Sequence, residues 1–523
     1  MTKRVMPNLS VRELRVGALI WGALTWSAVG FAVFQLFRGE GQHHWWALLA
    51  VAVPTLRVAI LSDYRQLIRT RFAEWWACCQ TFHTRSGPIP WQGTFTFVVL
   101  PFAFLFLMNS KVQVGDNAPV FLAASSLVRE GNLECSEFVE IAEWSNLGNQ
   151  QALNVGLRHT SRGIYSNYPV GPLQVAIPVA MVSRLVGADL DRIKVHERLQ
   201  KFSAACLSAV CLGLFFLVAV CLAPPESAWV ATLLLALGSA MYSTIAVGIW
   251  QHGGIIFWSL VFVLTEYRQS QSSSWKWTLL QGVALGSMIP WRPSSLLVAG
   301  SLGLWTLCRK PKQAVLVALV AALAFLPWGM FYWTCYENLL GPTHTQSEQG
   351  NWHWTSIDGF LGVLISPGRG FIVYQPWIVL VGLWLLPAVR ASHSAVPLSM
   401  NRQSILPFCA LAVILNFTLV GAWCMWWGGW CYGSRLNSEV LPLAALLCLR
   451  PITYLWVSLH GRKLIIGLLF FAFLIHASCV YCGADRWDGV PNDIDHHPER
   501  LWRWDDPPFL YPLLKNISGR GAA

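Results

Sequence analysis

Charged residues are scarce in this sequence. Only 12% of its 523 residues are Asp, Glu, Lys or Arg, against roughly 25% in a typical soluble protein. This shortage excludes a disordered chain, a nucleic-acid-binding tail and an ordinary cytosolic enzyme. Hydrophobic residues make up 55% of the chain instead, and the mean hydropathy is +0.47. The composition predicts an all-α polytopic integral membrane protein with sizeable loops.

Several signatures of soluble enzymes and of repeat proteins are also missing. No glycine-rich nucleotide-phosphate loop, Ser-His-Asp signature or Rossmann fingerprint occurs where a strand, turn and helix could carry it. Nucleotide-sugar chemistry on the cytosolic side is therefore unsupported. No internal repeat of fixed period is present, which excludes a solenoid and an obvious inverted-repeat transporter.

Long apolar stretches occur throughout the chain. A helix needs roughly 20 residues to cross a bilayer, so thirteen spans would occupy about half of the sequence. The predicted spans are Gly17–Phe37, Trp45–Leu61, Thr94–Met108, Phe202–Leu222, Trp229–Val247, Gly253–Tyr267, Thr278–Ile289, Ser294–Leu307, Ala314–Trp333, Phe371–Val389, Ile405–Trp423, Leu436–Leu449 and Leu464–Val480.

The apolar segment 170–187 is ambiguous because it also carries two prolines and an arginine. If it does not cross the membrane, the loops on the cytosolic side hold a large excess of Lys and Arg over Asp and Glu, as cytosolic loops normally do. We therefore predict a helix that lies on or dips into the outer face. The net charge of +11 is then explained by cytosolic loops, and no nucleic-acid partner is expected.

This topology predicts four regions. Residues 1–93 form extra N-terminal spans and a basic cytosolic loop, and residues 94–450 form the main transmembrane module with a large exterior loop, 109–201. Residues 451–480 contain the last span, and residues 481–523 form an exterior tail. We predict that the chain is an integral protein of the bacterial inner membrane, with a cytosolic N-terminus and an exterior C-terminus.

The first candidate for chemistry is Asp116, which follows the third predicted span beside a glycine. A carboxylate at this boundary can accept a proton from a hydroxyl or bind a metal; alternatively, it caps the following helix. Next comes a Tyr-Pro-x-Gly-Pro stretch that begins at Tyr168, where proline and glycine favour a rigid turn.

Two short exterior turns follow. Trp-Gln-His-Gly contains Gln251 and His252, and His252 can donate a hydrogen bond to a phosphate or can be an ordinary satisfied polar residue. Pro-Trp-Arg-Pro contains Arg292, which must reach an anion, a carbonyl or the interface. The planar guanidinium suits phosphate, whereas snorkelling to the interface is the alternative.

Two further arginines lie among helix breakers. Arg369 stands in Ser-Pro-Gly-Arg-Gly, and Arg435 ends the stretch Trp-Trp-Gly-Gly-Trp-Cys-Tyr-Gly-Ser-Arg, which contains Trp426, Trp427 and Tyr432. Aromatic rings beside an arginine suit sugar or prenyl packing with a phosphate contact. A plain aromatic belt at the membrane interface is the alternative.

In this order, the motifs resemble those of the type C glycosyltransferase superfamily, which includes protein O-mannosyltransferases and lipid A aminoarabinose transferases. The resemblance covers roughly residues 94–450 and is closest to bacterial members without an assigned substrate. It implies a polyprenyl-phosphate sugar donor and a glycan, lipid or protein acceptor. Members often carry a second acidic residue near the Trp-Gln-His-Gly position, and this sequence has none there.

The resemblance also implies roles for the candidate residues. Asp116 is the catalytic carboxylate in an inverting transfer, and the four groups that hold the donor phosphate are His252, Arg292, Arg369 and Arg435. The residues expected to contact the donor lipid or sugar are Tyr168, Gln251, Trp426, Trp427 and Tyr432. No cofactor is certain, and dependence on a divalent metal stays open.

Two alternatives remain: a lipid or polysaccharide transporter, and an inactive homologue. A transporter should carry ionisable residues in the middle of its spans. Arg57 is the only Lys, Arg, Asp or Glu well inside a predicted span, which favours the enzyme.

Overall fold

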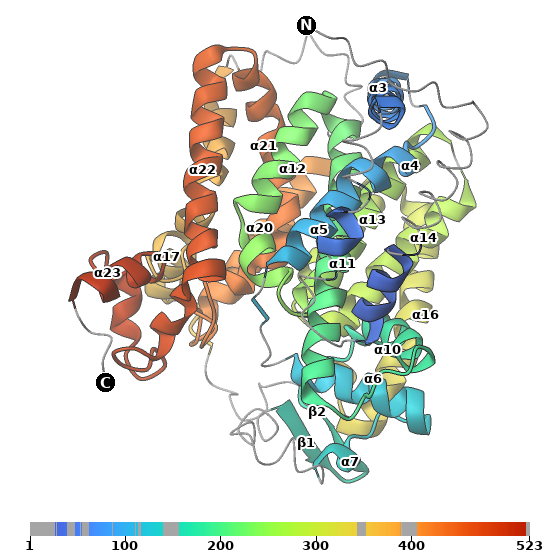
Figure 1. The fold of residues 1–523 in the computed structure, drawn as a ribbon, viewed down its shortest axis with the longest axis vertical. Helices are drawn as coiled ribbons and strands as arrows, with labels where there is room; N and C mark the ends of the chain where they lie inside the picture. The colour runs from blue at the N-terminus through green and yellow to red at the C-terminus, as the bar shows by residue number, and fades with distance from the viewer. Residues whose placement is uncertain are drawn as a thin grey trace, which may run out of the picture.

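The computed structural model describes residues 27, 29–38, 46, 48–52, 54, 62–85, 87–109, 111–112, 117–139, 156–272, 274–342, 352–387, 389 and 405–518. This part of the chain is helical apart from one two-stranded hairpin, as the composition predicts (Figure 1). Asp116 and Arg57 lie outside the described residues.

Five of the described helices are long and apolar enough to cross a membrane. They are Trp91–Met108 (α4, Trp91–Thr94; η1, Phe95–Val99; α5, Leu100–Met108), α11 (Ile193–Leu222), α16 (Pro311–Tyr336), Arg435–Trp456 (η8, Arg435–Val440; α21, Leu441–Trp456) and α22 (Leu459–Cys482). Shorter apolar helices are Val29–Arg38, α10 (Leu173–Leu185), α12 (Pro225–Leu237), α15 (Ser295–Arg309), η5 (Pro376–Leu385) and α20 (Leu406–Ala422). The chain is therefore an all-α integral membrane protein.

The remaining helices connect or flank these. They are α3 (Ser62–Arg85), α6 (Ala118–Glu130), α7 (Ser136–Val139), η2 (Met241–Ile245), α13 (His252–Gln271), α14 (Trp275–Met288), η3 (Ile289–Trp291), α17 (Ile357–Ile365), α18 (Phe371–Tyr374), η9 (Ala484–Gly489), η10 (Pro498–Trp502), η11 (Pro508–Leu510) and α23 (Tyr511–Ser518).

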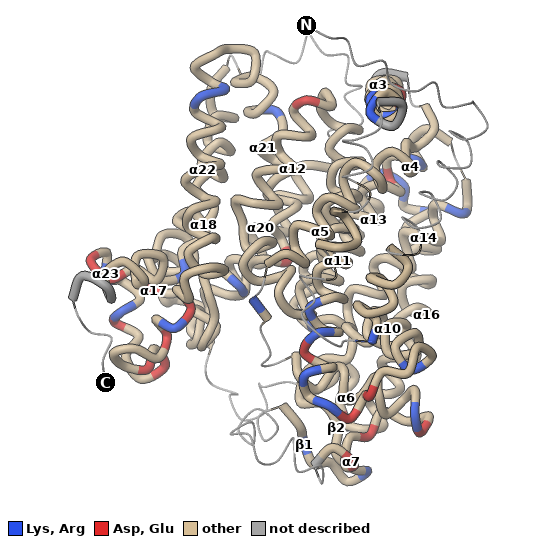
Figure 2. Tube along the Cα trace, in the orientation of Figure 1, with Lys and Arg blue, Asp and Glu red and all other residues tan. Residues whose placement is uncertain are grey.

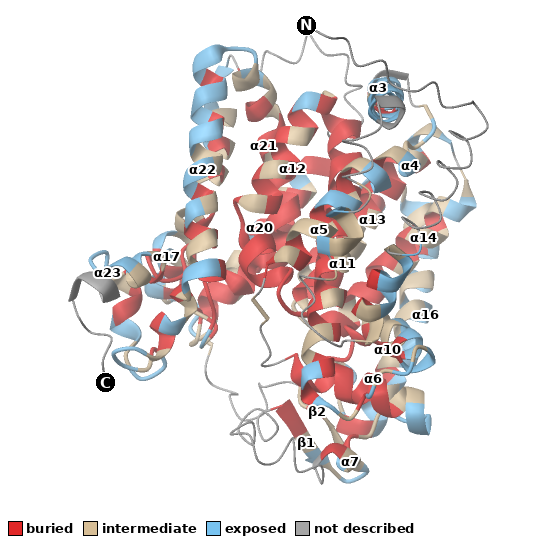
Figure 3. Cartoon of the chain, in the orientation of Figure 1, coloured by how far each residue is buried: buried red, intermediate tan, exposed pale blue. Residues whose placement is uncertain are grey.

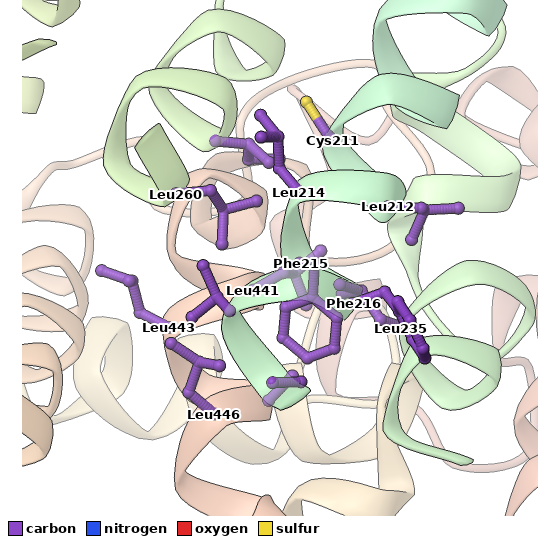
Figure 4. Close-up of a cluster of buried hydrophobic side chains, with 14 of the residues drawn as sticks. Cys211, Leu212, Leu214, Phe215, Phe216, Leu235, Leu260, Leu441, Leu443 and Leu446 are labelled. Atoms are coloured by element: carbon purple, nitrogen blue, oxygen red, sulfur yellow. The ribbon is translucent and has the colours of Figure 1, made fainter. Parts of the chain in front are cut away.

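Helix α11 lies at the centre of the hydrophobic core. Its side chains Phe215 and Phe216 pack among leucines from α12, α13 and α21 (Figure 4). Buried residues run through the middle of the helical body, whereas the outward faces of α16 and α22 are largely exposed (Figure 3). Exposed apolar faces on long helices are what lipid contact requires.

Helix α3, the C-terminal ends of α11 and α13 and the residue before α16 lie at one end of the body. Helix α3 contacts the ends of α11 and α13 there. Its His83 Nδ1 lies 2.8 Å from the carbonyl oxygen of Val220, and the Tyr267 hydroxyl donates to the carbonyl of Phe82 at 3.1 Å. At the same end, Lys310 pairs with Glu266 at 3.1 Å. Charged residues concentrate near the two ends and in the C-terminal tail (Figure 2).

Several predicted boundaries need correction. Helix α11 begins at Ile193, nine residues before the predicted start at Phe202. The N-terminal region 1–93, which is predicted to hold a basic cytosolic loop, contains the helix α3, which the hydropathy pattern did not indicate. The ambiguous segment 170–187 forms α10, a helix of 13 residues. At 1.5 Å per residue this helix is about 20 Å long, which is shorter than the bilayer core of about 30 Å.

The predicted exterior loop 109–201 also holds the hairpin, which pairs β1 (Leu157–Thr160) with β2 (Gly163–Ser166). Glu134 fastens it, because its carboxylate accepts from the Ile164 amide at 2.6 Å and from the hydroxyl and amide of Ser136 at 2.5 and 3.1 Å. Burial acts to raise the pKa of Glu134, but these hydrogen bonds outweigh it and hold the pKa below its ordinary value.

Candidate functional site

Two of the predicted motifs dock directly on each other. The amide of Gly171, in the Tyr-Pro-x-Gly-Pro turn, donates to the carbonyl of Pro290 at 2.7 Å. A Cβ atom on Gly171 would lie 2.4 Å from Trp291 Cα, so only glycine permits this approach. The Tyr332 hydroxyl donates to the Pro290 carbonyl and accepts from the Val170 amide, each at 2.9 Å. The turn that begins at Tyr168 thus positions the turn that carries Arg292.

Arg292 and His252 both reach Glu439, a fully buried carboxylate in η8. Its Oε2 lies 3.2 Å from His252 Nδ1 and 3.4 Å from an Arg292 Nη atom. Its Oε1 accepts from the Ser294 hydroxyl at 3.0 Å and from the Asn416 amide at 2.6 Å. The site therefore contains an acidic residue beside Trp-Gln-His-Gly in space, although none stands beside it in the sequence.

Lys201 and Arg435 lie along the segment that leads to His252. The side chain of Lys201 is fully buried on α11, and its Nζ donates to the carbonyl of Ala246 at 3.1 Å. The Arg435 guanidinium lies 4.8 Å from the ring centroid of Trp250 and donates to the carbonyl of Gly428 at 2.9 Å. Residues 246–252 therefore contact Lys201 at one end, Arg435 in the middle and Glu439 at the other end.

We call Lys201, His252, Arg292, Arg435 and Glu439 the basic cluster. Arg292 contacts the carboxylate of Glu439, and Lys201 and Arg435 contact Ala246 and Trp250 in the segment that leads to His252. A buried ammonium group with a single carbonyl partner is poorly compensated in a low-dielectric interior. Lysine carries three donors and Lys201 uses one on Ala246, so an anion is a suitable ligand for this site.

Arg369 belongs to a different network, at the C-terminal tail. Its guanidinium donates to the carbonyls of Trp427 at 3.1 Å, Gly368 at 3.0 Å and Gly429 at 3.2 Å, and it pairs with Asp488 at 2.5 Å. Burial raises the pKa of Asp488 to about 6, although Arg369 acts to lower it. The hydrogen bonds of Arg369 are used to hold the tail on the body.

Of the residues predicted to contact the donor lipid or sugar, some are buried in the fold and others line a pocket or are partly exposed. Tyr432 is buried, donates to the Ile475 carbonyl at 2.6 Å and packs edge-on against another tyrosine ring. Tyr168 is also buried, and its backbone is bonded to the Ser166 hydroxyl. Trp426 is buried and Trp427 half-buried, and both line a pocket beside the tail. Gln251 is half-buried and directly precedes α13.

The structure thus brings His252, Arg292 and Arg435 together and places Arg369 apart from them. It adds Lys201 and Glu439, which sequence reasoning missed. Both left a signal: Glu439 is an ionisable residue inside a predicted span, and Lys201 directly precedes one. Both are buried, Lys201 in α11 and Glu439 near the start of the apolar helix Arg435–Trp456.

No metal-binding group of three or more His, Cys, Asp or Glu occurs in the part of the chain that the structure describes. The sequence matches no protein-family model, and comparison with curated protein sequences finds no similar protein.

Proposed function

We propose that this protein is a membrane glycosyltransferase that takes a sugar from a polyprenyl-phosphate donor at the exterior face. The observation that carries the proposal is the basic cluster, in which a buried lysine and two arginines lie around His252 and the segment before it. A lipid-linked phosphate is an anion that reaches such a site from the bilayer. The proposed architecture is that of type C enzymes, with about thirteen spans and the reaction outside.

The chemistry uses these residues in the following way. An acceptor hydroxyl attacks the anomeric carbon of the donor sugar and inverts it. The bond between that carbon and the phosphate oxygen breaks, and the phosphate leaves with the electron pair. Lys201, Arg292 and Arg435 stabilise the developing negative charge, which is worth most where water is excluded. Asp116 takes the proton of the acceptor hydroxyl, an assignment that rests on its place in the sequence.

Glu439 acts as a positioning residue in this scheme. Its two oxygens receive hydrogen bonds or ionic contacts from four side chains on three segments, so it fixes the direction of Arg292 and the ring of His252. Arg369 is assigned a structural role, because its guanidinium holds the tail.

The test measures donor binding and donor turnover separately, with labelled polyprenyl-phosphate sugars and protein in lipid nanodiscs. Lys201→Gln should weaken donor binding about 10- to 100-fold, the equivalent of one lost hydrogen bond to a charged group. Asp116→Asn should abolish turnover while donor binding persists. The matched control is Lys312→Gln, because Lys312 is an exposed residue on the first turn of α16, outside the basic cluster.

Donor binding that is equal in Lys201→Gln and Lys312→Gln would refute the role of the cluster. Absence of turnover with every donor and acceptor offered would refute the enzyme.

The second candidate is a lipid or polysaccharide transporter, and burial of Lys201 and Glu439 in the helical body favours it. Transport of a fluorescent lipid-linked oligosaccharide across proteoliposomes, without cleavage, distinguishes it from the transferase.

A further inference from the structure

A separate pocket of about 250 Å³ lies beside the C-terminal tail. Its walls come from residues 353–358, from residues 423–427 and from Pro498 and Leu501 in η10. Three segments that are far apart in the sequence therefore meet here, one of them from the tail 481–523 that is predicted to be exterior. The volume lies below the roughly 300–1,000 Å³ of sites for drug-sized ligands, so the pocket suits a single ring.

Three tryptophans form much of the wall: Trp423, Trp426 and Trp427. Trp426 fits closely against α17, because a Cβ atom on Gly362 would lie 2.4 Å from its ring. The indole N–H of Trp427 donates to Asp495 at 2.8 Å. Since packing or a hydrogen bond holds these rings, the wall is largely formed before any ligand binds.

Two polar side chains complete the pocket. Asp358 and His353 are both exposed, and neither side chain has a hydrogen bond to another side chain or to backbone within the described ranges. The carboxylate can accept from hydroxyl groups, and the imidazole can donate or accept. Indole faces carry negative charge density, which attracts the polarised C–H groups on one face of a sugar ring. Together, the pocket combines apolar faces with polar groups at the rim.

We propose that this pocket binds one sugar unit of a carbohydrate acceptor. This inference rests on the proposed function, and it assigns Trp426 and Trp427 to the acceptor rather than to the donor. A lipid tail has no hydroxyl groups to pair with Asp358 or His353, so a sugar uses the pocket more fully. The pocket is linked to the basic cluster, because Arg435 donates to the carbonyl of Gly428, the residue after Trp427.

The probe is a panel of methyl glycosides of common hexoses and pentoses, added to the full protein in nanodiscs. Saturation-transfer-difference NMR reads binding from the ligand. It is preferable to tryptophan fluorescence here because the chain contains 29 tryptophans. At least one glycoside should bind, and Asp358→Asn and Trp427→Ala should each weaken its binding at least fivefold.

The matched control is Trp504→Ala, which removes an indole that is 62% exposed and does not line the pocket. No binding of any glycoside, or equal binding by the wild type and both pocket variants, overturns the inference. A loss in Trp504→Ala as large as in Trp427→Ala also overturns it.

Donor turnover is measured on the same samples to separate this inference from the proposed function. Donor hydrolysis without glycoside binding refutes the pocket and leaves the transferase standing. Specific glycoside binding without any donor turnover refutes the transferase and shows that the pocket recognises sugar by itself.

Discussion

Replacing Glu439 by glutamine tests whether the basic cluster is held together by charge. Glutamine keeps the shape of the side chain and one carbonyl oxygen. That oxygen can face His252 and Arg292 while the new amide faces Ser294 and Asn416. Ser294 can rotate its hydroxyl, and Asn416 can turn its buried and otherwise unbonded Oδ1 toward the amide. The neutral partners therefore adapt, whereas Arg292 loses its countercharge.

The size of the effect follows from that difference. A hydrogen bond to a charged group contributes about 1.5–3 kcal/mol, so Glu439→Gln should lower the free energy of unfolding by about 2–3 kcal/mol. Glu439→Ala also leaves buried donors without an acceptor and should cost about 3–5 kcal/mol. Arg292→Gln should cost less in the Glu439→Gln background than alone, with a coupling of about 1–3 kcal/mol.

The assay is equilibrium unfolding in mixed micelles with increasing dodecyl sulfate, followed with a thiol-reactive dye. The readout suits this protein because nine of its fourteen cysteines are buried. The control is Glu226→Gln, an exposed residue in the first turn of α12, where the helix dipole is worth about 0.3–1 kcal/mol. A loss in Glu439→Gln no larger than in this control, or additive double variants, would refute the reasoning.

Three further predictions follow from the same contacts. Arg369→Gln should make the tail at least tenfold more sensitive to limited proteolysis, whereas Arg503→Gln, at an exposed pair in that tail, should not. Gly171→Ala should lower the free energy of unfolding by more than 2 kcal/mol and abolish donor turnover, whereas Gly300→Ala, which meets open space, should do neither. The lowered pKa of Glu134 stabilises the fold above about pH 4.5, its ordinary value, and this contribution is lost as the pH falls below it; Glu134→Gln should therefore show a smaller fall in thermal midpoint between pH 6 and pH 4.

Hydropathy predicts most of the helical body because apolar runs report what lies in the membrane. It fails at boundaries where a helix continues into polar sequence. Helix α11 starts at Ile193 because tertiary packing, rather than hydropathy, covers its first turns: Leu199 and Gln200 are buried. A polar residue such as Lys201 is read as loop from sequence, although the fold buries it.

The candidate site is predictable in part for a similar reason. Arg292 and Arg435 stand among helix breakers, so the sequence itself marks them as unusual. Glu439 is marked only as an ionisable residue inside a predicted span, and its role could not be predicted because its partners, from His252 to Asn416, are distant in the chain. The pairing of Arg369 with Asp488 in the tail is equally invisible, since 119 residues separate the two.

The distribution of buried charge bears on the choice between a transferase and a transporter. A transport path needs polar or ionisable groups along the membrane axis. Lys201 and Glu439 instead contact the same short segment, at Ala246 and His252. The Glu266–Lys310 pair lies at the opposite end of α13, and between the two ends α11 presents Phe215 and Phe216 to an apolar core. Ionisable groups that lie at the two ends of α13, with an apolar core between them, favour chemistry on a ligand that enters from one face over passage through the body.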